Sequence, residues 1–224
     1  MPLARVLEPE VMDSPQEAVD YDAMDHSTVN RLFVDDFLAV WQSHGRAAGD
    51  AEILDLGTGT AQIPIELLRR DSRFRVVGID LAESMLGLGR QNVSAAGFCD
   101  GIRLEKVDAK HLPYVSATFA AVISNSIVHH IPDPREVLSE ASRVLDPDGI
   151  LFVRDLLRPD NDATVAQLVE AYAAGGNDHQ RQLFAASLRA ALRLDEIREI
   201  VHQLGHDPVH VRQTSDRHWT WATP

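Results

Sequence analysis

The sequence predicts a doubly wound α/β fold, in which helices cover both faces of a mostly parallel sheet. Five short apolar runs alternate with helical stretches between residues 53 and 153. Apolar runs of this length indicate strands buried on both faces, and their alternation with helices is typical of a parallel sheet. The chain has 224 residues, of which 45% are hydrophobic and 25% charged, enough for one domain with a substantial core.

The N-terminal part predicts an arm followed by a helix. Pro2, Pro9 and Pro15 lie in a stretch without periodicity, so residues 1–19 are expected to be irregular. From Asp20, apolar side chains recur every three or four residues, which predicts an amphipathic helix that ends at Gly45. The predicted strands then follow at 53–56, 75–80, 102–107, 121–124 and 150–153.

The rest of the chain predicts helices and a terminal hairpin. A helix begins at Asp133-Pro134 and ends at the turn 146–149. Residues after Leu157 are helical for about 45 positions, with a break at 175–178 and Asp195 as the N-cap of the last helix. Two tail strands, 208–213 and 218–222, are expected to form an antiparallel hairpin at the edge of the sheet.

Composition argues against several function classes. The chain has 21 basic and 34 acidic side chains, and its net charge of −13 disfavours nucleic acid and anionic lipid as partners. No apolar run reaches the roughly 18 to 20 residues of a membrane span, and the N-terminus lacks a secretory apolar core. We therefore expect a cytoplasmic protein.

The metal-ligating residue types predict no metal site. Cys99 is the single cysteine, so neither an internal disulfide nor a thiolate cluster can form. Gly205 and Pro208 interrupt the helical register that neighbouring tail histidines would need to share a metal. Those histidines are His202, His206, His210 and His218.

A glycine-rich turn is the strongest chemical signal. Residues 53–61 read Ile-Leu-Asp-Leu-Gly-Thr-Gly-Thr-Ala, an apolar strand that runs into a turn opening a helix. Glycines let such a turn curl tightly and let a ligand touch bare backbone. Asp55 lies where a carboxylate can meet an ammonium group, and Gln62 stands where a dinucleotide fingerprint has its third glycine. NAD(P) therefore fits poorly.

Two further strands also end in acids. Asp80 ends the second strand about twenty residues after the turn, the place where a carboxylate accepts the ribose hydroxyls of an adenosine. Leu81 and Met85 follow as apolar neighbours for an adenine, and Asp108 can accept the adenine amino group. Strands that end in acids at one edge of a sheet predict a single ligand crevice there.

Together these motifs resemble the class I S-adenosylmethionine-dependent methyltransferase family. Five family motifs occur in order, at residues 55–61, 77–86, 108–109, 119–131 and 143–151. Ala61 stands in a place often taken by glycine, and Ala120 in one often taken by aspartate. The resemblance implies a seven-stranded sheet with a reversed edge strand and S-adenosyl-L-methionine as cofactor. The cofactor-binding residues it implies are Asp55, Gly57, Thr58, Gly59, Asp80, Leu81, Met85, Asp108, Ala109 and Asn125.

The resemblance also implies how the chain is divided. Residues 1–45 would be an arm and a capping helix, and residues 46–224 the cofactor-binding domain, within a single domain overall. A helical insert at about 156–205 would cover the substrate.

Three residues are candidates for catalysis. His130, or less favourably His129, could take a proton from an attacking hydroxyl or amine, since a pKa near 6.5 suits that task. One of them could instead be a structural cap of its loop, because paired histidines are common here in the family. Tyr21, with His26, could close over the methyl group or simply pack at the start of the helix.

The expected acceptor is a small molecule. Residues 125–128 read Asn-Ser-Ile-Val, whereas nucleic-acid amino methyltransferases resemble one another in an Asn/Asp-Pro-Pro-aromatic motif at this place. The sequence does not choose between O-, N- and C-methylation, although an oxygen or nitrogen nucleophile is the expectation, and a homodimer is an open alternative. Two rival functions remain: a non-catalytic sensor or partner subunit that binds the cofactor or its product, and a nucleotide-dependent oxidoreductase.

Overall fold

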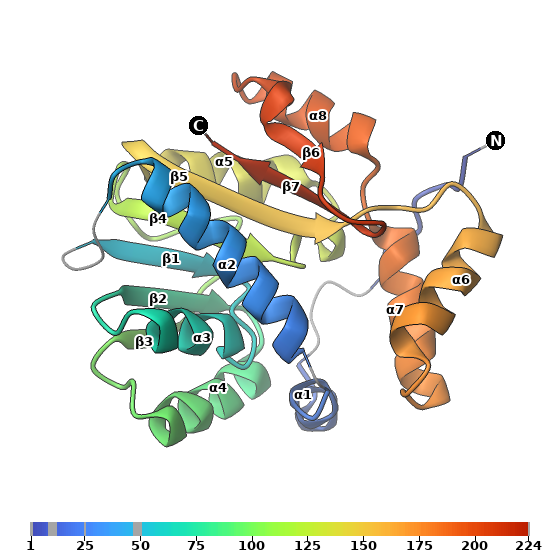
Figure 1. Ribbon diagram of the computed structural model, residues 1–224, viewed down its shortest axis with the longest axis horizontal. Coiled ribbons are helices and arrows are strands. Elements are labelled where there is room, and N and C mark those ends of the chain that lie inside the picture. Colours follow the sequence, from blue (N-terminus) through green and yellow to red (C-terminus); the bar gives the residue numbers. More distant parts are fainter. Residues whose placement is uncertain (1, 9–12, 25, 47–50, 224) are drawn as a thin grey trace. The chain divides into compact units, whose positions relative to one another are not determined.

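The computed structural model describes the chain except residues 1, 9–12, 25, 47–50 and 224, and the side chain of Glu17. Its strands form one seven-stranded sheet in the order β3-β2-β1-β4-β5-β7-β6 (Figure 1). The strands are β1 Glu52–Leu56, β2 Arg75–Asp80, β3 Ile102–Lys106, β4 Phe119–Asn125, β5 Leu145–Leu156, β6 Val211–Gln213 and β7 His218–Ala222. The predicted α/β fold is confirmed.

Strand pairing defines where a ligand can approach. β1 pairs in parallel with both β2 and β4, and β6 pairs antiparallel with β7. The chain passes from β1 outward to β3 and then returns to β4 on the other side of β1. Adjacent loops diverge at such a reversal, so a ligand is expected to bind at the carboxyl ends of β1 and β4.

Most of the described helices connect these strands. They are α1 Pro15–Asp22, α2 Ser27–Ser43, α3 Gln62–Arg70, α4 Glu83–Ala96, α5 Pro134–Val144, α6 Asp162–Ala173, α7 Asp178–Ala190 and α8 Leu194–Gln203, with short 3₁₀ turns η1 Val128–His130 and η2 Pro208–His210. α2 crosses the front of the sheet in Figure 1. It buries Phe33, Phe37 and Trp41 against strand residues, and the Phe33 ring meets Phe152 edge to face at 5.1 Å.

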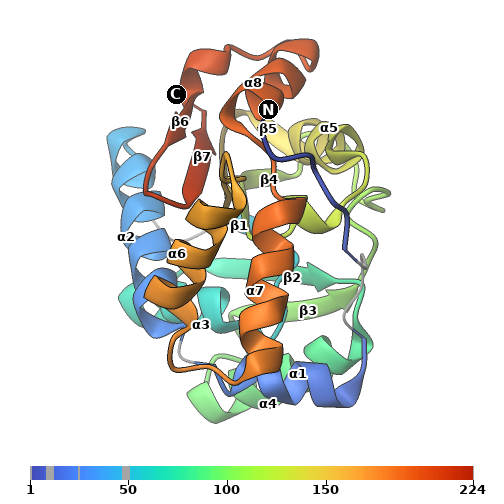
Figure 2. The same cartoon turned by 90° about the vertical axis from the view of Figure 1, so that its right-hand side faces the viewer.

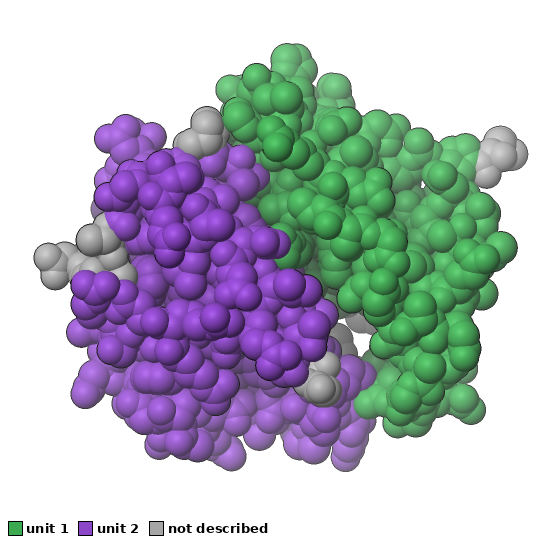
Figure 3. Space-filling view, viewed as in Figure 1, with its two compact units in different colours: residues 1–10, 126–135, 154–221 green, residues 11–125, 136–153, 222–224 purple. Residues whose placement is uncertain are grey.

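The chain divides into two compact units, coloured in Figure 3. Unit 2 comprises residues 11–125, 136–153 and 222–224 and holds β1 to β4 with α1 to α4. Its main core is the apolar layer between α2, α3 and the strands.

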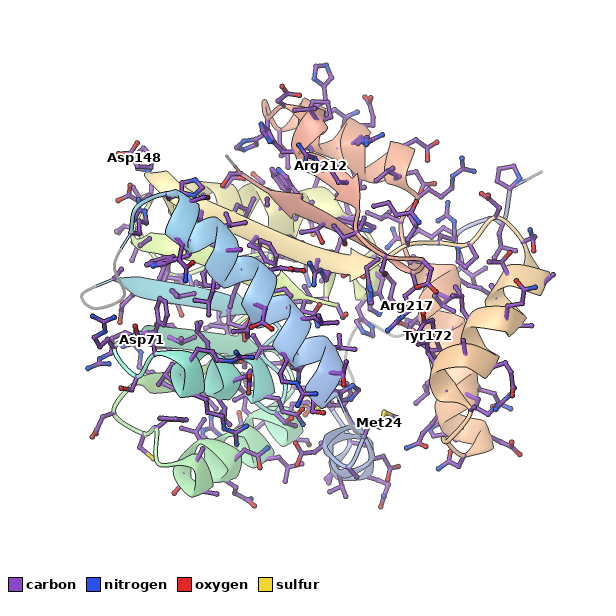
Figure 4. All side chains as sticks on the ribbon, in the orientation of Figure 1. Met24, Asp71, Asp148, Tyr172, Arg212 and Arg217 are labelled. Carbon is purple, nitrogen blue, oxygen red and sulfur yellow. The ribbon has the colours of Figure 1, made fainter. Side chains whose placement is uncertain are left out.

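Unit 1 comprises residues 1–10, 126–135 and 154–221. In it α6 and α7 lie side by side (Figure 2) and enclose a small core that includes Val165, Leu168 and Leu188. Arg217 stacks on the ring of Tyr172, with Cζ 3.3 Å from the ring centroid, and both residues are labelled in Figure 4. The break predicted at 175–178 separates α6 from α7 and is confirmed.

Four local predictions are wrong. Residues 15–22, expected to lie in an irregular arm up to residue 19, form α1. Ala18 of this helix packs against Ala82 and Met85 at the start of α4, a contact that local sequence does not reveal. β5 begins at Leu145 and runs through the predicted turn. Arg193, not Asp195, caps α8, and Pro208–His210 is the 3₁₀ turn η2, so β6 begins only at Val211. The helix end at Gly45 and the antiparallel tail hairpin are confirmed.

Candidate functional site

The turn after β1 requires left-handed backbone at alternate residues. Gly57 has φ of 69° and Gly59 of 54°, and Ala61 follows at 63° as the N-cap of α3. Only glycine adopts this region without a steric penalty. The conformation explains why glycine is common at the position of Ala61.

Two neighbouring elements hold this turn in place. The Thr58 amide donates to the Ile79 carbonyl of β2 at 2.9 Å. On α4, a Cβ added to Gly89 would lie 3.3 Å from the Gly59 carbonyl oxygen, so helix and turn are in backbone contact. The turn is therefore built from β1, β2 and α4 together.

Asp80 is fixed at the end of β2 by backbone amides. Its Oδ2 accepts from the Gly59 amide at 2.8 Å, and its Oδ1 accepts from the Ala82 amide at 2.9 Å. Burial raises the pKa of Asp80, while these amides lower it. Each carboxylate oxygen has two lone pairs, so both retain an acceptor site for the ribose hydroxyls that the sequence predicts.

Asp55 is a buried acid in the middle of the site. Its side chain is 2% exposed, and Oδ2 receives no hydrogen bond from the described residues. The pKa of Asp55 is raised to about 7. Burial is the largest cause; the nearby Thr58 hydroxyl lowers the pKa, and the charge of Asp80 raises it. A buried carboxylate is stabilised when a cation pairs with it, so Asp55 fits an ammonium group.

Other buried polar atoms near the reversal point also lack partners. Within the described parts of the chain, Thr60 Oγ1 and Asn125 Oδ1 make no hydrogen bond. Buried polar groups are normally satisfied, so such a set at one sheet edge indicates a polar ligand. The residues present therefore fit the predicted cofactor.

The remaining predicted cofactor residues have structural neighbours. Asp108 accepts from the Lys110 amide at 2.9 Å and lies 3.2 Å from its ammonium group. Burial would raise the pKa of Asp108, but Lys110 lowers it overall. Leu81 is half-buried and Ala109 is buried, while Met85 packs against Ala18 of α1.

Tyr21 lies in the same unit, close to the glycine turn. Its Cε1 would be 3.9 Å from a Cβ added to Gly59, and its ring stacks on His26 at 4.7 Å. Tyr21 as a whole is 36% exposed, but the surroundings of its hydroxyl, together with the charges of Asp80 and Asp55, raise the pKa of Tyr21 to about 12. Tyr21 is therefore protonated at neutral pH and can donate a hydrogen bond but cannot act as a base.

The two predicted histidines belong to unit 1 and form part of η1. His129 is buried, its Nδ1 is 2.6 Å from Asp155 Oδ1, and its Nε2 is 3.4 Å from Glu8 Oε1. Burial would lower the pKa of His129, but Asp155 and then Glu8 raise it overall. The Nδ1 of His130 lies 3.2 Å from the same Glu8 oxygen.

Sequence reasoning missed Glu8 and Asp155. Asp155 is 1% exposed at the end of β5 and accepts from the Val128 amide at 2.6 Å. Asp155 lies at the end of a strand, as Asp55 and Asp80 do, and this position could have identified it from the sequence. Glu8 lies in the proline-containing arm, where no pattern marked it.

Comparison with known proteins agrees with this geometry. Residues 54–153 match the family model described as a methyltransferase domain. This segment is a class I S-adenosylmethionine-dependent methyltransferase domain. The resemblance predicted from the five ordered motifs is thereby confirmed.

Curated relatives that resemble this chain are named as methyltransferases. Methyltransferase GfsG of Streptomyces halstedii is 26% identical over 167 residues, 74% of this chain and 56% of that protein. The 27-O-demethylrifamycin SV methyltransferase of Amycolatopsis mediterranei is 29% identical over 178 residues, 78% of this chain and 61% of that protein. The chain spans about half the length of several curated relatives that it matches.

Solved structures share the fold of the methyltransferase domain. A SAM-dependent methyltransferase from Aquifex aeolicus has a TM-score of 0.64 at 18% identity, covering 93% of this chain and 97% of that one. The plantazolicin methyltransferase BamL, solved with SAH, has a TM-score of 0.68 at 17% identity, covering 85% and 68%. Among the described residues, no helix of the chain is long and apolar enough to cross a membrane.

Proposed function

We propose that the chain transfers a methyl group from S-adenosylmethionine to an oxygen or nitrogen of a small molecule. The observation that carries this proposal is the Asp80 carboxylate, which the Gly59 and Ala82 amides hold at the end of β2 next to the unpaired Asp55 oxygen. The relative named as 27-O-demethylrifamycin SV methyltransferase supports the acceptor class.

In this proposal each strand end binds one part of the cofactor. Asp80 accepts the ribose hydroxyls, Asp55 pairs with the methionine ammonium group, and Asp108 accepts the adenine amino group. Gly57, Thr58 and Gly59 supply backbone contacts, Leu81, Met85 and Ala109 border the adenine, and Asn125 borders the methionine end. When bound, S-adenosylmethionine supplies a methyl group on a cationic sulfur, which becomes a neutral thioether after in-line displacement.

The chain's own contribution is alignment, exclusion of water and acceptance of a proton. Orientation of two reactants removes most of the entropic barrier to such a displacement. We assign the proton of the acceptor hydroxyl or amine to His130, whose side chain is 20% exposed, compared with 4% for His129. His129, held by Asp155, fixes the conformation of η1, and the neutral Tyr21 hydroxyl donates a hydrogen bond near the glycine turn.

Calorimetric titration with S-adenosylhomocysteine tests the cofactor site. We expect micromolar binding to the wild type and a loss of about 1 to 3 kcal/mol in Asp80→Ala, because the ribose hydrogen bonds disappear. Asp148→Asn, which changes an exposed acid on β5, is the control and should bind as the wild type does. Absence of binding to a folded wild type would overturn the proposal.

An acceptor screen separates the enzyme from the non-catalytic alternative. Radiolabelled methyl transfer should be detected with members of a panel of phenols, carboxylic acids and amines. Tight binding of S-adenosylhomocysteine without transfer to any acceptor class would favour a sensor or partner subunit.

A further inference from the structure

We propose that Glu8, His129 and His130 form a binding site for a divalent transition metal of the zinc class. One ligand atom from each of these residues lies within 4.8 Å of the other two. All three residues belong to unit 1, so the site is contained within one compact part of the chain. The tail histidines, for which the sequence predicts no shared site, are not involved.

The spacing of the ligand atoms suits a tetrahedral ion. Glu8 Oε1 lies 3.4 Å from His129 Nε2 and 3.2 Å from His130 Nδ1. Zinc lies about 2.0 to 2.1 Å from nitrogen and oxygen ligands, which places neighbouring ligand atoms of a tetrahedron roughly 3.3 Å apart. The two distances from Glu8 Oε1 to the histidine nitrogens therefore already match the separation of neighbouring ligands around zinc.

A second carboxylate orients one of the imidazoles. Asp155 Oδ1 lies 2.6 Å from His129 Nδ1, and Asp155 is itself held by the Val128 amide. A proton on Nδ1 directed at Asp155 leaves Nε2 unprotonated and directed at Glu8. Metal-binding histidines in proteins are typically held in this way by an outer carboxylate.

Glu8, the third ligand, is held in place by the residues that precede it. Leu3 and Val6 donate backbone hydrogen bonds to the carbonyls of Asp160 and Arg189, both at 3.1 Å. The Arg5 guanidinium donates to the carbonyls of Ala190 at 2.7 Å and Ile131 at 2.9 Å. Glu8 follows this anchored stretch, and its Oε1 accepts from the Ser187 hydroxyl at 3.0 Å.

The donor set selects the kind of ion. Two imidazole nitrogens and one carboxylate oxygen suit Zn²⁺ and its first-row neighbours, whereas Mg²⁺ prefers oxygen ligands in an octahedron. Three protein ligands leave one tetrahedral position for water. The side chain of His130 is 20% exposed, which gives an ion a route to the site.

Metal binding would join segments that lie far apart in the sequence. It would tie Glu8 of the arm to η1, 121 residues later, and so stabilise the folded arm. A coordinated His130 could not accept a proton, so Zn²⁺ should also inhibit turnover. Only this last consequence rests on the proposed function.

Titration of the chelator-treated full chain with Zn²⁺ tests the site. We expect one equivalent to bind with micromolar or tighter affinity, and Mg²⁺ not to compete. Glu8→Gln and His130→Ala should each weaken binding at least ~10-fold, since even outer residues of metal sites contribute that much. His202→Ala and His210→Ala, which remove histidines elsewhere in the same unit, should bind as the wild type does.

Co²⁺ gives a second readout, because its visible absorption reports tetrahedral coordination. Circular dichroism shows whether each variant is folded, and titration with S-adenosylhomocysteine shows separately whether the cofactor site is intact. The proposal is overturned if the folded wild type binds no Zn²⁺. It is equally overturned if Glu8→Gln and His130→Ala bind as tightly as the controls.

Discussion

Asp55 shows how burial can tune an acid of the proposed cofactor site. The carboxyl is enclosed at the end of β1, and burial raises its pKa to about 7. Its unfolded pKa is near 3.9. Between these values the folded chain holds a proton that the unfolded chain releases, so this group makes the free energy of unfolding fall as pH rises. A bound ammonium group would reverse that preference by favouring the carboxylate.

We therefore predict that cofactor affinity rises with pH. With a pKa of about 7, the ionised fraction of Asp55 increases roughly fivefold from pH 6 to pH 7, while the ligand amino group stays largely protonated. Calorimetry with S-adenosylhomocysteine should show an increase of that size. Asp55→Asn should bind more weakly and lose this dependence; an unchanged pH profile in the variant would contradict the assignment.

His129 is expected to matter for stability. It lies between Asp155 and Glu8, and removing it leaves the buried Asp155 carboxylate without its charged partner. We predict that His129→Ala lowers the free energy of unfolding by about 3 to 5 kcal/mol, as measured by urea denaturation. His202→Ala, on the exposed side of α8, should change it by less than about 0.5 kcal/mol. Equal losses in the two variants would show that the buried pair is not structural.

At the scale of the element, α4 contains two glycines in different surroundings. A Cβ at Gly87 would meet nothing within 4 Å, whereas a Cβ at Gly89 would lie 3.0 Å from Leu104 Cδ1 and 3.3 Å from the Gly59 carbonyl oxygen. Both substitutions to alanine gain helix propensity. A comparison of the two variants therefore isolates the effect of packing against Leu104 and the glycine turn.

We predict different stabilities for the two alanine variants. Gly87→Ala should stabilise the chain by about 0.5 to 1 kcal/mol. Gly89→Ala should be about 1 to 3 kcal/mol less stable than Gly87→Ala, because the added methyl group overpacks the turn. It should also weaken binding of S-adenosylhomocysteine. Urea denaturation and calorimetry on the matched pair measure both effects, and identical stabilities would contradict the close approach.

At the scale of the whole molecule, the arm is a structural part of unit 1. The Arg5 guanidinium reaches the carbonyls of Pro132 at 3.2 Å and His129 at 3.3 Å, in addition to those of Ala190 and Ile131. One side chain thus connects the start of the chain with η1 and with the end of α7.

Loss of this side chain should release the arm. We predict that Arg5→Ala makes residues 2–8 more sensitive to limited proteolysis, since four carbonyls lose their charged donor and three of these hydrogen bonds are part-buried. Arg212→Ala removes an exposed arginine of the same unit, labelled in Figure 4, and should not change the cleavage pattern. Cleavage of the arm at equal rates in both variants would show that Arg5 does not anchor it.

Much of the sheet and of the candidate cofactor site is predictable because both depend on local sequence. Short apolar runs mark the strands, and a parallel sheet brings their carboxyl ends to one edge, which is why Asp55 and Asp80 could be assigned together. The start of α1 was not predicted because the residues that Ala18 packs against, Ala82 and Met85, lie far along the chain. The 3₁₀ turn at Pro208 was missed because apolar residues alone do not distinguish it from a strand.

The sequence by itself determined the α/β fold, the glycine turn and the acids at the strand ends, because each depends on neighbouring residues or on a regular repeat. Only the tertiary structure decided what surrounds these groups. It buries Asp55 enough to raise its pKa, places Asp155 against His129, and brings Glu8 to a histidine pair 121 residues away. Burial and contacts across long loops are properties of the folded chain, and no local pattern encodes them.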